Sequence, residues 1–194
     1  MTKHRLVVVD LDGTLIDGSG VISVENRRAI RAVQKQGIAL TLATGRTFMT
    51  TEPFIKQLNI KLPVICYHGS LIRTKKKIFF SRRLPEPHLR QLIKFGFRHR
   101  VQVAIFSKEQ AFFNKPIDYW GREYINHIEP VNEINLVDLI NYDFPERPHK
   151  VMFVASERKI RQLEKLARRE FGHSFYVTRS RSNLLEFLHP HKRL

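Results

Sequence analysis

Two carboxylates lie side by side near the start of the chain, in the segment LVVVDLDGTLID (residues 6–17). Asp10 and Asp12 follow a run of β-branched residues, and Gly13 comes directly after them. Two carboxylates this close repel each other unless a cation bridges them or one of them carries a proton. Glycine lets the chain turn and expose backbone N–H groups that can hold a phosphate. The segment therefore predicts a metal site, acid–base chemistry, or both.

The elements around this segment predict how the acids are positioned. The continuous β-branched run at residues 6–9 is typical of a central parallel strand that is buried on both faces. A loop at residues 12–20 follows, and then a helix with Ser23 as its N-cap and Gly37 at its end. Residues 38–42 predict a second buried strand. This order predicts a right-handed βαβ unit with parallel strands.

A second group of polar residues ends the second strand, where Thr44, Gly45 and Arg46 follow one another. In an open α/β sheet, ligands bind outside the carboxyl ends of the strands. Because Asp10 and Asp12 end the first strand, we expect both groups to lie over one crevice. The Thr44 hydroxyl would add a hydrogen-bond donor for a phosphate there.

The remaining sequence predicts a short continuation of this sheet and then a separate α+β module. The continuation consists of a helix at 47–58, a strand at 63–67 and a hairpin of residues 71–73 and 78–80 around a lysine run. A proline-rich stretch at 84–88 marks the change. Beyond it we expect helices at 87–98 and 157–171 and strands at 101–106, 111–114, 150–156 and 175–178, with residues 115–143 ambiguous.

Three motifs in this order resemble those of a known family. DLDGTL (residues 10–15) resembles the first motif of the haloacid dehalogenase-like phosphotransferases, and TLATGR (residues 41–46) resembles the second motif of their Cof-like phosphatase subfamily. YHGS followed by LIR resembles a segment that usually reads Asn-Gly-Ala or Asn-Gly-Ser, with His68 in place of the asparagine. Together the motifs cover about the first 75 residues.

The resemblance implies an α/β fold in which a Rossmann-like core with a parallel sheet carries an inserted α+β cap. The core would comprise residues 1–83, the cap residues 84–188, and residues 189–194 would begin the return to the core. In this subfamily the cap closes over the crevice and selects the substrate.

The resemblance also implies a role for each residue of the first two motifs. Asp10 would be the nucleophile that forms an aspartyl-phosphate. Asp12 would protonate the leaving alcohol and then activate water. Mg²⁺ would be held by the Asp10 carboxylate and the main-chain carbonyl of Asp12. The phosphate- and substrate-binding residues would be Leu11, Gly13, Thr44, Gly45 and Arg46. Arg46 could instead pair with Glu25 or Glu52.

Two later motifs that the resemblance requires do not follow. They are a lysine that stabilises the phosphoryl group and a Gly-Asp-x-x-Asn-Asp segment that completes the magnesium site. LLEFLHPHKRL (residues 184–194) looks like the returning strand of the cap, and Lys192 is a poor candidate for the lysine. We therefore expect the chain to be the N-terminal part of a longer phosphatase, with weakened Mg²⁺ binding, an incomplete core sheet and exposed apolar surface.

The composition limits which classes of protein are possible. With 34 Lys and Arg against 18 Asp and Glu, the net charge is +16, which suits an anionic partner. The basic residues are scattered rather than striped along one helix, which favours a solvated basic surface. No apolar run approaches a membrane span and no signal peptide is evident, so we expect a cytoplasmic protein. Cys66, the single cysteine, fits a reducing compartment.

Two functions follow from these observations. The first is a Mg²⁺-dependent phosphatase that acts on a small phosphorylated metabolite of the sugar phosphate or nucleotide type. The alternative is an inactive remnant that binds anions or nucleic acid through its basic surface. Nucleic acid ranks lower as a partner because no recognition helix or RNA-binding motif is present. The oligomeric state stays open.

Overall fold

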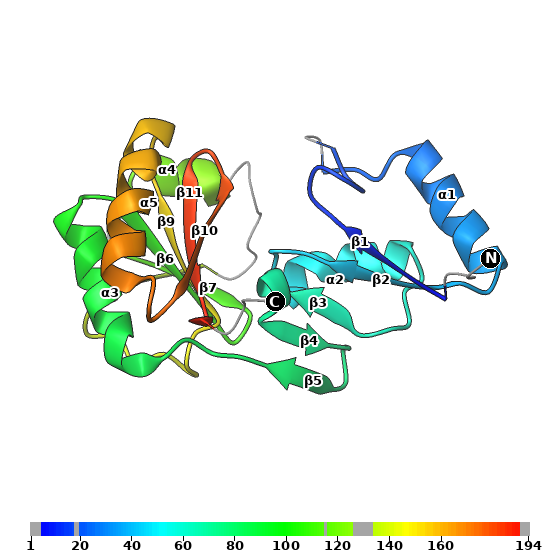
Figure 1. The fold of residues 1–194 in the computed structure, drawn as a ribbon, viewed down its shortest axis with the longest axis horizontal. Helices are drawn as coiled ribbons and strands as arrows, with labels where there is room; N and C mark the ends of the chain where they lie inside the picture. Colours follow the sequence, from blue (N-terminus) through cyan, green and yellow to red (C-terminus); the bar gives the residue numbers. More distant parts are fainter. Residues whose placement is uncertain (1–4, 18–19, 115, 126–133, 191–194) are drawn as a thin grey trace. The chain divides into compact units, whose positions relative to one another are not determined.

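The chain divides into two compact units, Met1–Ser81 and Arg82–Leu194 (Figure 1). The computed structural model describes residues 5–17, 20–114, 116–125 and 134–190. The first unit holds all the residues predicted for catalysis and phosphate binding. The second is the α+β module expected beyond the proline-rich stretch.

The first unit is built on a five-stranded sheet with the order β1-β2-β3-β4-β5. The strands β1 to β3 are parallel, as the βαβ pattern predicted, and β3 to β5 pair antiparallel. The lysine run lies in the turn between β4 and β5, where Lys75 to Lys77 are exposed. The strands are β1 (Leu6–Asp10), β2 (Ala39–Ala43), β3 (Val64–Cys66), β4 (Leu71–Arg73) and β5 (Ile78–Ser81).

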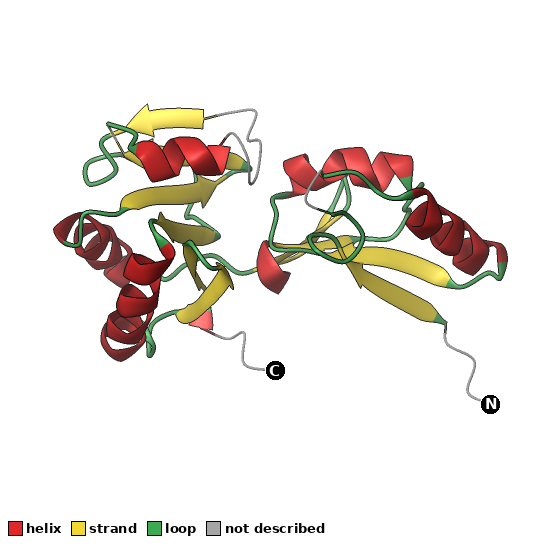
Figure 2. Ribbon diagram, turned by 90° about the horizontal axis from the view of Figure 1, so that it is seen from above, coloured by secondary structure: helices red, strands yellow, loops and turns green. Residues whose placement is uncertain are grey.

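Both long helices of this unit lie on one face of the sheet (Figure 2). The helix α1 (Val24–Lys35) begins as predicted, because the Ser23 side chain accepts a hydrogen bond of 3.0 Å from the backbone N–H of Asn26. In the same way, Thr47 caps α2 (Phe48–Gln57). Each cap satisfies one of the amide groups that the first turn of a helix leaves without an intrahelical partner. A single turn of 3₁₀ helix, η1 (Tyr67–Gly69), follows β3.

The prediction that the first strand is central and buried on both faces is wrong for the described structure. β1 ends the strand order, and the exposed fractions of Leu6 and Val8 are 50% and 47%. On the other face, Leu40 and Leu42 are buried where they pair with Val7 and Val9. A β-branched run indicates a strand. Burial on both faces also requires a further strand and a second layer, and the described residues of this unit supply neither.

The second unit contains a six-stranded sheet with the order β10-β11-β9-β6-β7-β8. All neighbours are antiparallel except β7 and β8, which are parallel. The ambiguous stretch contains a short helix, α4 (Tyr119–Glu123), and the strand β8. The strands are β6 (Gln102–Ser107), β7 (Gln110–Asn114), β8 (Ile134–Val137), β9 (Lys150–Val154), β10 (Tyr176–Arg181) and β11 (Leu184–Leu188).

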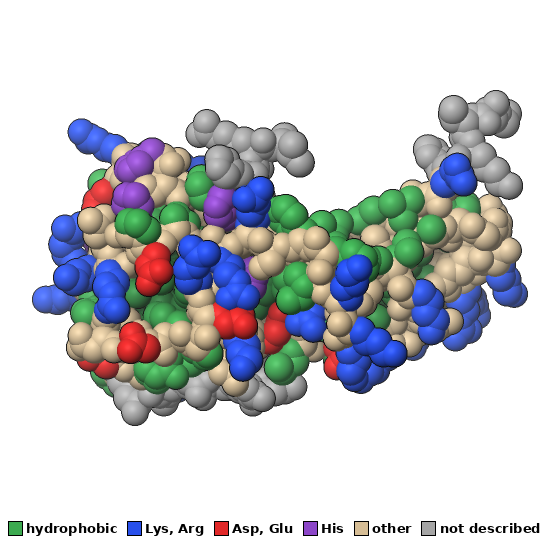
Figure 3. All heavy atoms as spheres, turned by 90° about the horizontal axis from the view of Figure 1, so that it is seen from below, with side chains coloured by type: hydrophobic (Ala, Val, Ile, Leu, Met, Phe, Trp, Pro, Cys, Tyr) green, Lys and Arg blue, Asp and Glu red, His purple; other side chains and the backbone are tan. Residues whose placement is uncertain are grey.

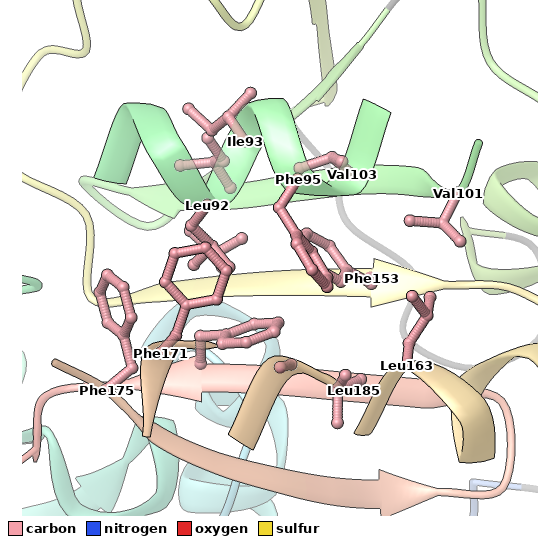
Figure 4. Close-up of a cluster of buried hydrophobic side chains, with 14 of the residues drawn as sticks. Leu92, Ile93, Phe95, Val101, Val103, Phe153, Leu163, Phe171, Phe175 and Leu185 are labelled. Atoms are coloured by element: carbon pink, nitrogen blue, oxygen red, sulfur yellow. The ribbon is translucent and has the colours of Figure 1, made fainter. Parts of the chain in front are cut away.

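Two amphipathic helices, α3 (Glu86–Arg98) and α5 (Glu157–Phe171), bury their apolar sides against one face of this sheet (Figure 4). Aromatic rings form much of the core between them. Phe95 packs edge-to-face on Phe171 at 5.3 Å between ring centroids, and Phe153 lies 4.7 Å from Phe187. The phenylalanine content of the sequence is thus largely explained by this core.

The opposite face of the same sheet carries a buried ion pair. Val151 and Phe153 face the helices, so the alternation of a strand places Lys150 on the other side. The Lys150 Nζ lies 3.0 Å from a carboxylate oxygen of Glu186, and both side chains are less than 5% exposed. The Nζ also lies 4.4 Å from the ring centroid of Phe106. Loss of either partner would leave the other charge buried without its counter-ion.

Candidate active site

The parallel pairing of β1 and β2 brings the two predicted groups to one edge of the sheet. Asp10 pairs in register with Ala43, so the residues that follow each strand are neighbours. Asp10 is exposed at the end of β1, and Asp12 lies two residues further on. A direct contact between Asp12 and Arg46 joins the two loops. The sequence predicted this meeting correctly, because the carboxyl ends of parallel strands share one edge.

The loop after β1 is closed by its own backbone. Gly13 has a φ of +74°, which favours glycine, and its N–H donates to the carbonyl of Ile16 at 3.0 Å. The N–H groups of Leu15 and Ile16 both donate to the carbonyl of Leu11, whose side chain is fully buried. The side-chain amide of Asn26 donates to the carbonyl of Leu15 at 3.0 Å and so ties the loop to α1. The loop thus holds Asp10 and Asp12 on a fixed backbone.

Thr44 is buried at the end of β2, and its backbone is fully used. Its N–H donates to the carbonyl of Ile65 at 2.9 Å, and its carbonyl accepts from the N–H of His68 at 3.0 Å. The Oγ1 atom accepts from the N–H of Arg46 at 3.1 Å. Because a hydroxyl can accept and donate at the same time, the Thr44 hydroxyl can also donate a hydrogen bond to an anion.

Arg46 holds Asp12 with a two-pronged contact. Its Nε donates to Oδ2 at 2.9 Å and its Nη2 donates to Oδ1 at 2.8 Å. Side-chain exposures of 11% for Arg46 and 30% for Asp12 make this a partly buried pair. The guanidinium carbon also lies 5.6 Å from the ring centroid of Phe54. Fork-to-fork contacts of this kind fix the orientation of the carboxylate.

The partner of Arg46 corrects the sequence analysis, which offered Glu25 or Glu52 for the pairing. Glu52 instead pairs with Lys56 at 3.5 Å and with Lys75 at 3.2 Å. The hydrogen bond from the Lys75 ammonium is the largest cause that lowers the pKa of the Glu52 carboxyl. Charge alone did not show which acid lies nearest to Arg46, because the loop at residues 11–16 decides it.

The turn after β3 completes the site with residues to which the sequence gave no firm role. Tyr67 and His68 have positive φ values of 48° and 52°, which are uncommon outside glycine. The Tyr67 N–H donates to the carbonyl of Arg46 at 3.0 Å, so this turn is bonded to the loop after β2. The imidazole of His68 covers Gly45: a Cβ atom there would lie 2.4 Å from Cε1 and Nε2 of the ring. A larger residue at position 45 would therefore require the His68 ring to move.

The donor set for a magnesium ion is of the right kind, and most of the ligands would have to come from other groups such as water and phosphate. Carboxylate and carbonyl oxygens suit Mg²⁺, which demands near-octahedral coordination by six oxygens. Asp10 and the carbonyl of Asp12 would supply two. Within the described ranges, no group of three or more His, Cys, Asp and Glu side chains is arranged to hold a metal ion.

The basic residues form no single stripe on the face shown in Figure 3. Lys and Arg side chains are scattered there among polar and apolar ones. Among the residues that the structure describes, no helix is long and apolar enough to cross a membrane.

Comparison with known proteins places the chain in a family. The model of the haloacid dehalogenase-like hydrolases matches residues 7–192. The chain is similar to the 5-amino-6-(5-phospho-D-ribitylamino)uracil phosphatase YcsE of Bacillus subtilis (strain 168), with 38% identity over 80 residues, 41% of this chain and 32% of that protein. It is also similar to the pyridoxal phosphate phosphatase YbhA of Escherichia coli (strain K12), with 24% identity over 114 residues, 58% of this chain and 42% of that protein.

A solved structure shows the same fold over nearly the whole chain. It is a haloacid dehalogenase-like hydrolase from Bacteroides thetaiotaomicron, with a TM-score of 0.82 and 22% identity over 97% of this chain and 72% of that one. The chain therefore belongs to the haloacid dehalogenase-like hydrolase family. This confirms the resemblance carried by DLDGTL and TLATGR and the α/β fold class. The chain spans about a third of the length of YcsE and less than half of YbhA. The expected longer phosphatase stays a prediction.

Proposed function

We propose that this site hydrolyses phosphate monoesters of small metabolites, with Asp10 as the nucleophile. The observation that carries the proposal is the exposed Asp10 carboxylate at the end of β1, beside a second acid that Arg46 holds in place. By their names, YcsE and YbhA are phosphatases of a ribityl phosphate compound and of pyridoxal phosphate. Both names support a small phosphorylated substrate, and the name of YcsE supports one that carries a sugar-like phosphate.

The proposed chemistry has two displacement steps at phosphorus. A carboxylate oxygen of Asp10 forms a bond to phosphorus while the bond to the ester oxygen breaks, and the alcohol leaves with a proton from Asp12. Asp12 then takes a proton from water, and the hydroxide oxygen displaces Asp10 from phosphorus. Phosphate is released and both acids return to their starting state.

Asp12 needs help to perform both proton transfers. In the resting geometry both of its oxygens accept from Arg46. The fork keeps the carboxylate in one orientation. We expect one of its two contacts to break when the substrate binds, because the freed oxygen must take up a proton from solvent before it can protonate the leaving alcohol. Arg46 is thus proposed as a positioning residue that can also contact the substrate.

The remaining predicted residues are proposed to surround the phosphoryl group. The Thr44 hydroxyl and the backbone N–H of Gly45 beside it would donate to its oxygens. The Gly13 N–H donates to Ile16 and would have to leave that carbonyl in order to bind a phosphate. Leu11 would contribute only its backbone, because its side chain is buried.

A magnesium ion is proposed as the cofactor. Asp10 and the carbonyl of Asp12 would provide two of its ligands, and the others would be water, phosphate oxygens or groups outside the described residues. When bound, the ion would neutralise charge on the transferring phosphoryl group.

The second unit is proposed as the cap that selects the substrate. The assignment of residues 84–188 to the cap, and of 189–194 to a return segment, rests on the motifs and on the order of elements. Residues 191–194 lie outside the described residues. A cytoplasmic location is proposed, and the single buried cysteine, Cys66, supports a reducing compartment.

Phosphate release by the purified chain in the presence of magnesium tests the proposal. We expect hydrolysis of a small phosphate monoester that falls by roughly a hundred-fold or more in Asp10→Asn, because the amide is a poor nucleophile. Asp17→Asn is the matched control, since Asp17 is an exposed acid of the same loop. Equal release from wild type and Asp10→Asn would exclude Asp10 as the nucleophile. A salt-dependent shift of DNA or RNA without release would favour the anion-binding alternative.

A further inference from the structure

The turn at residues 67–69 stores backbone strain beside the proposed phosphate site. Tyr67, His68 and Gly69 have consecutive positive φ values of 48°, 52° and 91°. For a non-glycine residue this left-handed region is unfavourable, because its Cβ approaches the following carbonyl oxygen. Such a conformation persists only where the surrounding structure holds it, and strain of this kind clusters at functional sites. The strain therefore points to a functional role for this turn.

The surrounding contacts hold this turn firmly against the loop after β2. Tyr67 is fully buried, and its N–H donates to the carbonyl of Arg46. The N–H of His68 donates to the carbonyl of Thr44, and the N–H of Ser70 donates back to Tyr67, each at 3.0 Å. These bonds fix the backbone of His68 relative to Thr44 and Arg46, so its side chain has a defined place in the site.

That place is the surface of Gly45, between Thr44 and Arg46. The atoms Cε1 and Nε2 of the His68 ring occupy the space where a Cβ atom at position 45 would lie. They form the end of the imidazole that is furthest from the backbone of His68. His68 is itself only partly buried. An imidazole carries at least one N–H in either protonation state, and an N–H is a suitable donor for an anion. Together with the Thr44 hydroxyl, it offers a second side-chain donor where the turn after β3 meets the loop after β2.

We propose that His68 contacts the substrate and that its imidazole N–H donates to a non-bridging oxygen of the phosphate monoester bound at Thr44. The inference rests on the proposed function for the location of the phosphate. Maintaining the turn alone does not require an imidazole, because asparagine tolerates the left-handed conformation as well. The ring is therefore assigned to binding, and it determines how tightly the site holds a phosphoryl group.

Titration of the full chain with inorganic phosphate at neutral pH tests this assignment. We expect the dissociation constant to rise roughly ten-fold in His68→Asn, which keeps the left-handed turn and withdraws the ring nitrogens from the phosphate. Thr44→Val should weaken binding as well, because it removes the neighbouring hydroxyl. His173→Asn, which changes an exposed histidine of the second unit, should bind as wild type does.

A second measurement is independent of any effect of the substitution on folding. In the wild-type chain, the Cε1–H resonance of His68 should shift on addition of phosphate with the same midpoint as the binding curve. If Thr44→Val weakens binding while His68→Asn binds as wild type does and the resonance stays fixed, the assignment of His68 is overturned and the proposed function stands. If the wild-type chain binds no phosphate, both fail.

Discussion

At the scale of single residues, the site depends on a contact between two loops. Arg46 grips both oxygens of Asp12 at 2.8 and 2.9 Å. A lysine at this position would keep the charge and lose the planar fork. The proposed role of Asp12 as an acid therefore rests on the geometry that Arg46 imposes on its carboxylate.

Arg46→Lys is expected to lower kcat more than it raises KM. The loss should be roughly ten-fold or more for an alkyl phosphate, whose leaving alcohol needs a proton. It should be smaller for p-nitrophenyl phosphate, whose leaving group departs without one. Steady-state kinetics with both esters measure the difference.

Arg73→Lys provides the control for this experiment. Its guanidinium carbon lies 4.6 Å from the ring centroid of Phe48, and its nitrogens donate to the carbonyls of Thr74 and Lys75. The substitution should leave both rates near those of the wild type. Equal losses of kcat for the two esters in Arg46→Lys would show that Arg46 does not act through the proton transfer of Asp12.

The residues of the site were predictable to different degrees. Asp10, Asp12 and Thr44 could be placed together because each follows a parallel strand, and strand ends fix position from sequence alone. The Arg46 contact with Asp12 was not predictable, since it depends on how the loop after β1 closes on Ile16. The conformation of His68 was also hidden, because consecutive left-handed residues leave no pattern in composition.

At the scale of elements, helices with capping residues were predicted well and the environment of a strand was not. Ser23 and Gly37 mark the two ends of α1 in the sequence and in the structure. The burial of β1 was overestimated because the sequence of a strand does not show which elements will pack beside it. Residues 115–143 stayed ambiguous for a related reason: β8 exists through its pairing with β7, which lies about twenty residues earlier.

His149, which directly precedes β9, makes the free energy of unfolding depend on pH. The pKa of this histidine is lowered to about 4, chiefly by burial and secondly by the charge of Arg83, and Glu146 opposes both. The residue is 4% exposed, and its backbone N–H donates to the carbonyl of Phe106 at 3.0 Å. His149 is therefore neutral in the folded chain at pH 7.

The free energy of unfolding should fall as the pH drops from about 6.5 to about 4. In that window the unfolded chain binds a proton on His149 that the folded chain does not, so the unfolded state gains stability. The loss contributed by this group should approach roughly 3 kcal/mol and should not grow further below pH 4. Urea unfolding of the full chain at several pH values between 7 and 4 measures it.

His149→Gln should flatten this dependence, whereas His173→Gln, at an exposed position, should preserve it. A residual slope is expected in His149→Gln, because the pKa of His99 is also lowered, first by burial and then by Arg98 and Lys159. A wild-type slope in His149→Gln would contradict the assignment of the pH dependence to this residue.

At the scale of the whole molecule, the net charge of +16 is spread over both units. The first hundred residues carry 19 Lys and Arg against 6 Asp and Glu. On the face shown in Figure 3, the basic side chains form no stripe of the kind that tracks a nucleic acid backbone. A small anion at one sheet edge agrees better with this distribution. The family match over residues 7–192 agrees with the same conclusion.

The central claim is that Asp10 accepts the phosphoryl group. The most direct test is to mix the chain with magnesium and a phosphate monoester, quench with acid and locate the phosphoryl group by peptide mass spectrometry. We predict a phosphoryl group on Asp10 in the wild type and in Asp17→Asn, and none in Asp10→Asn. A phosphoryl group on another residue, or phosphate release without any acyl-phosphate on Asp10, would contradict the account.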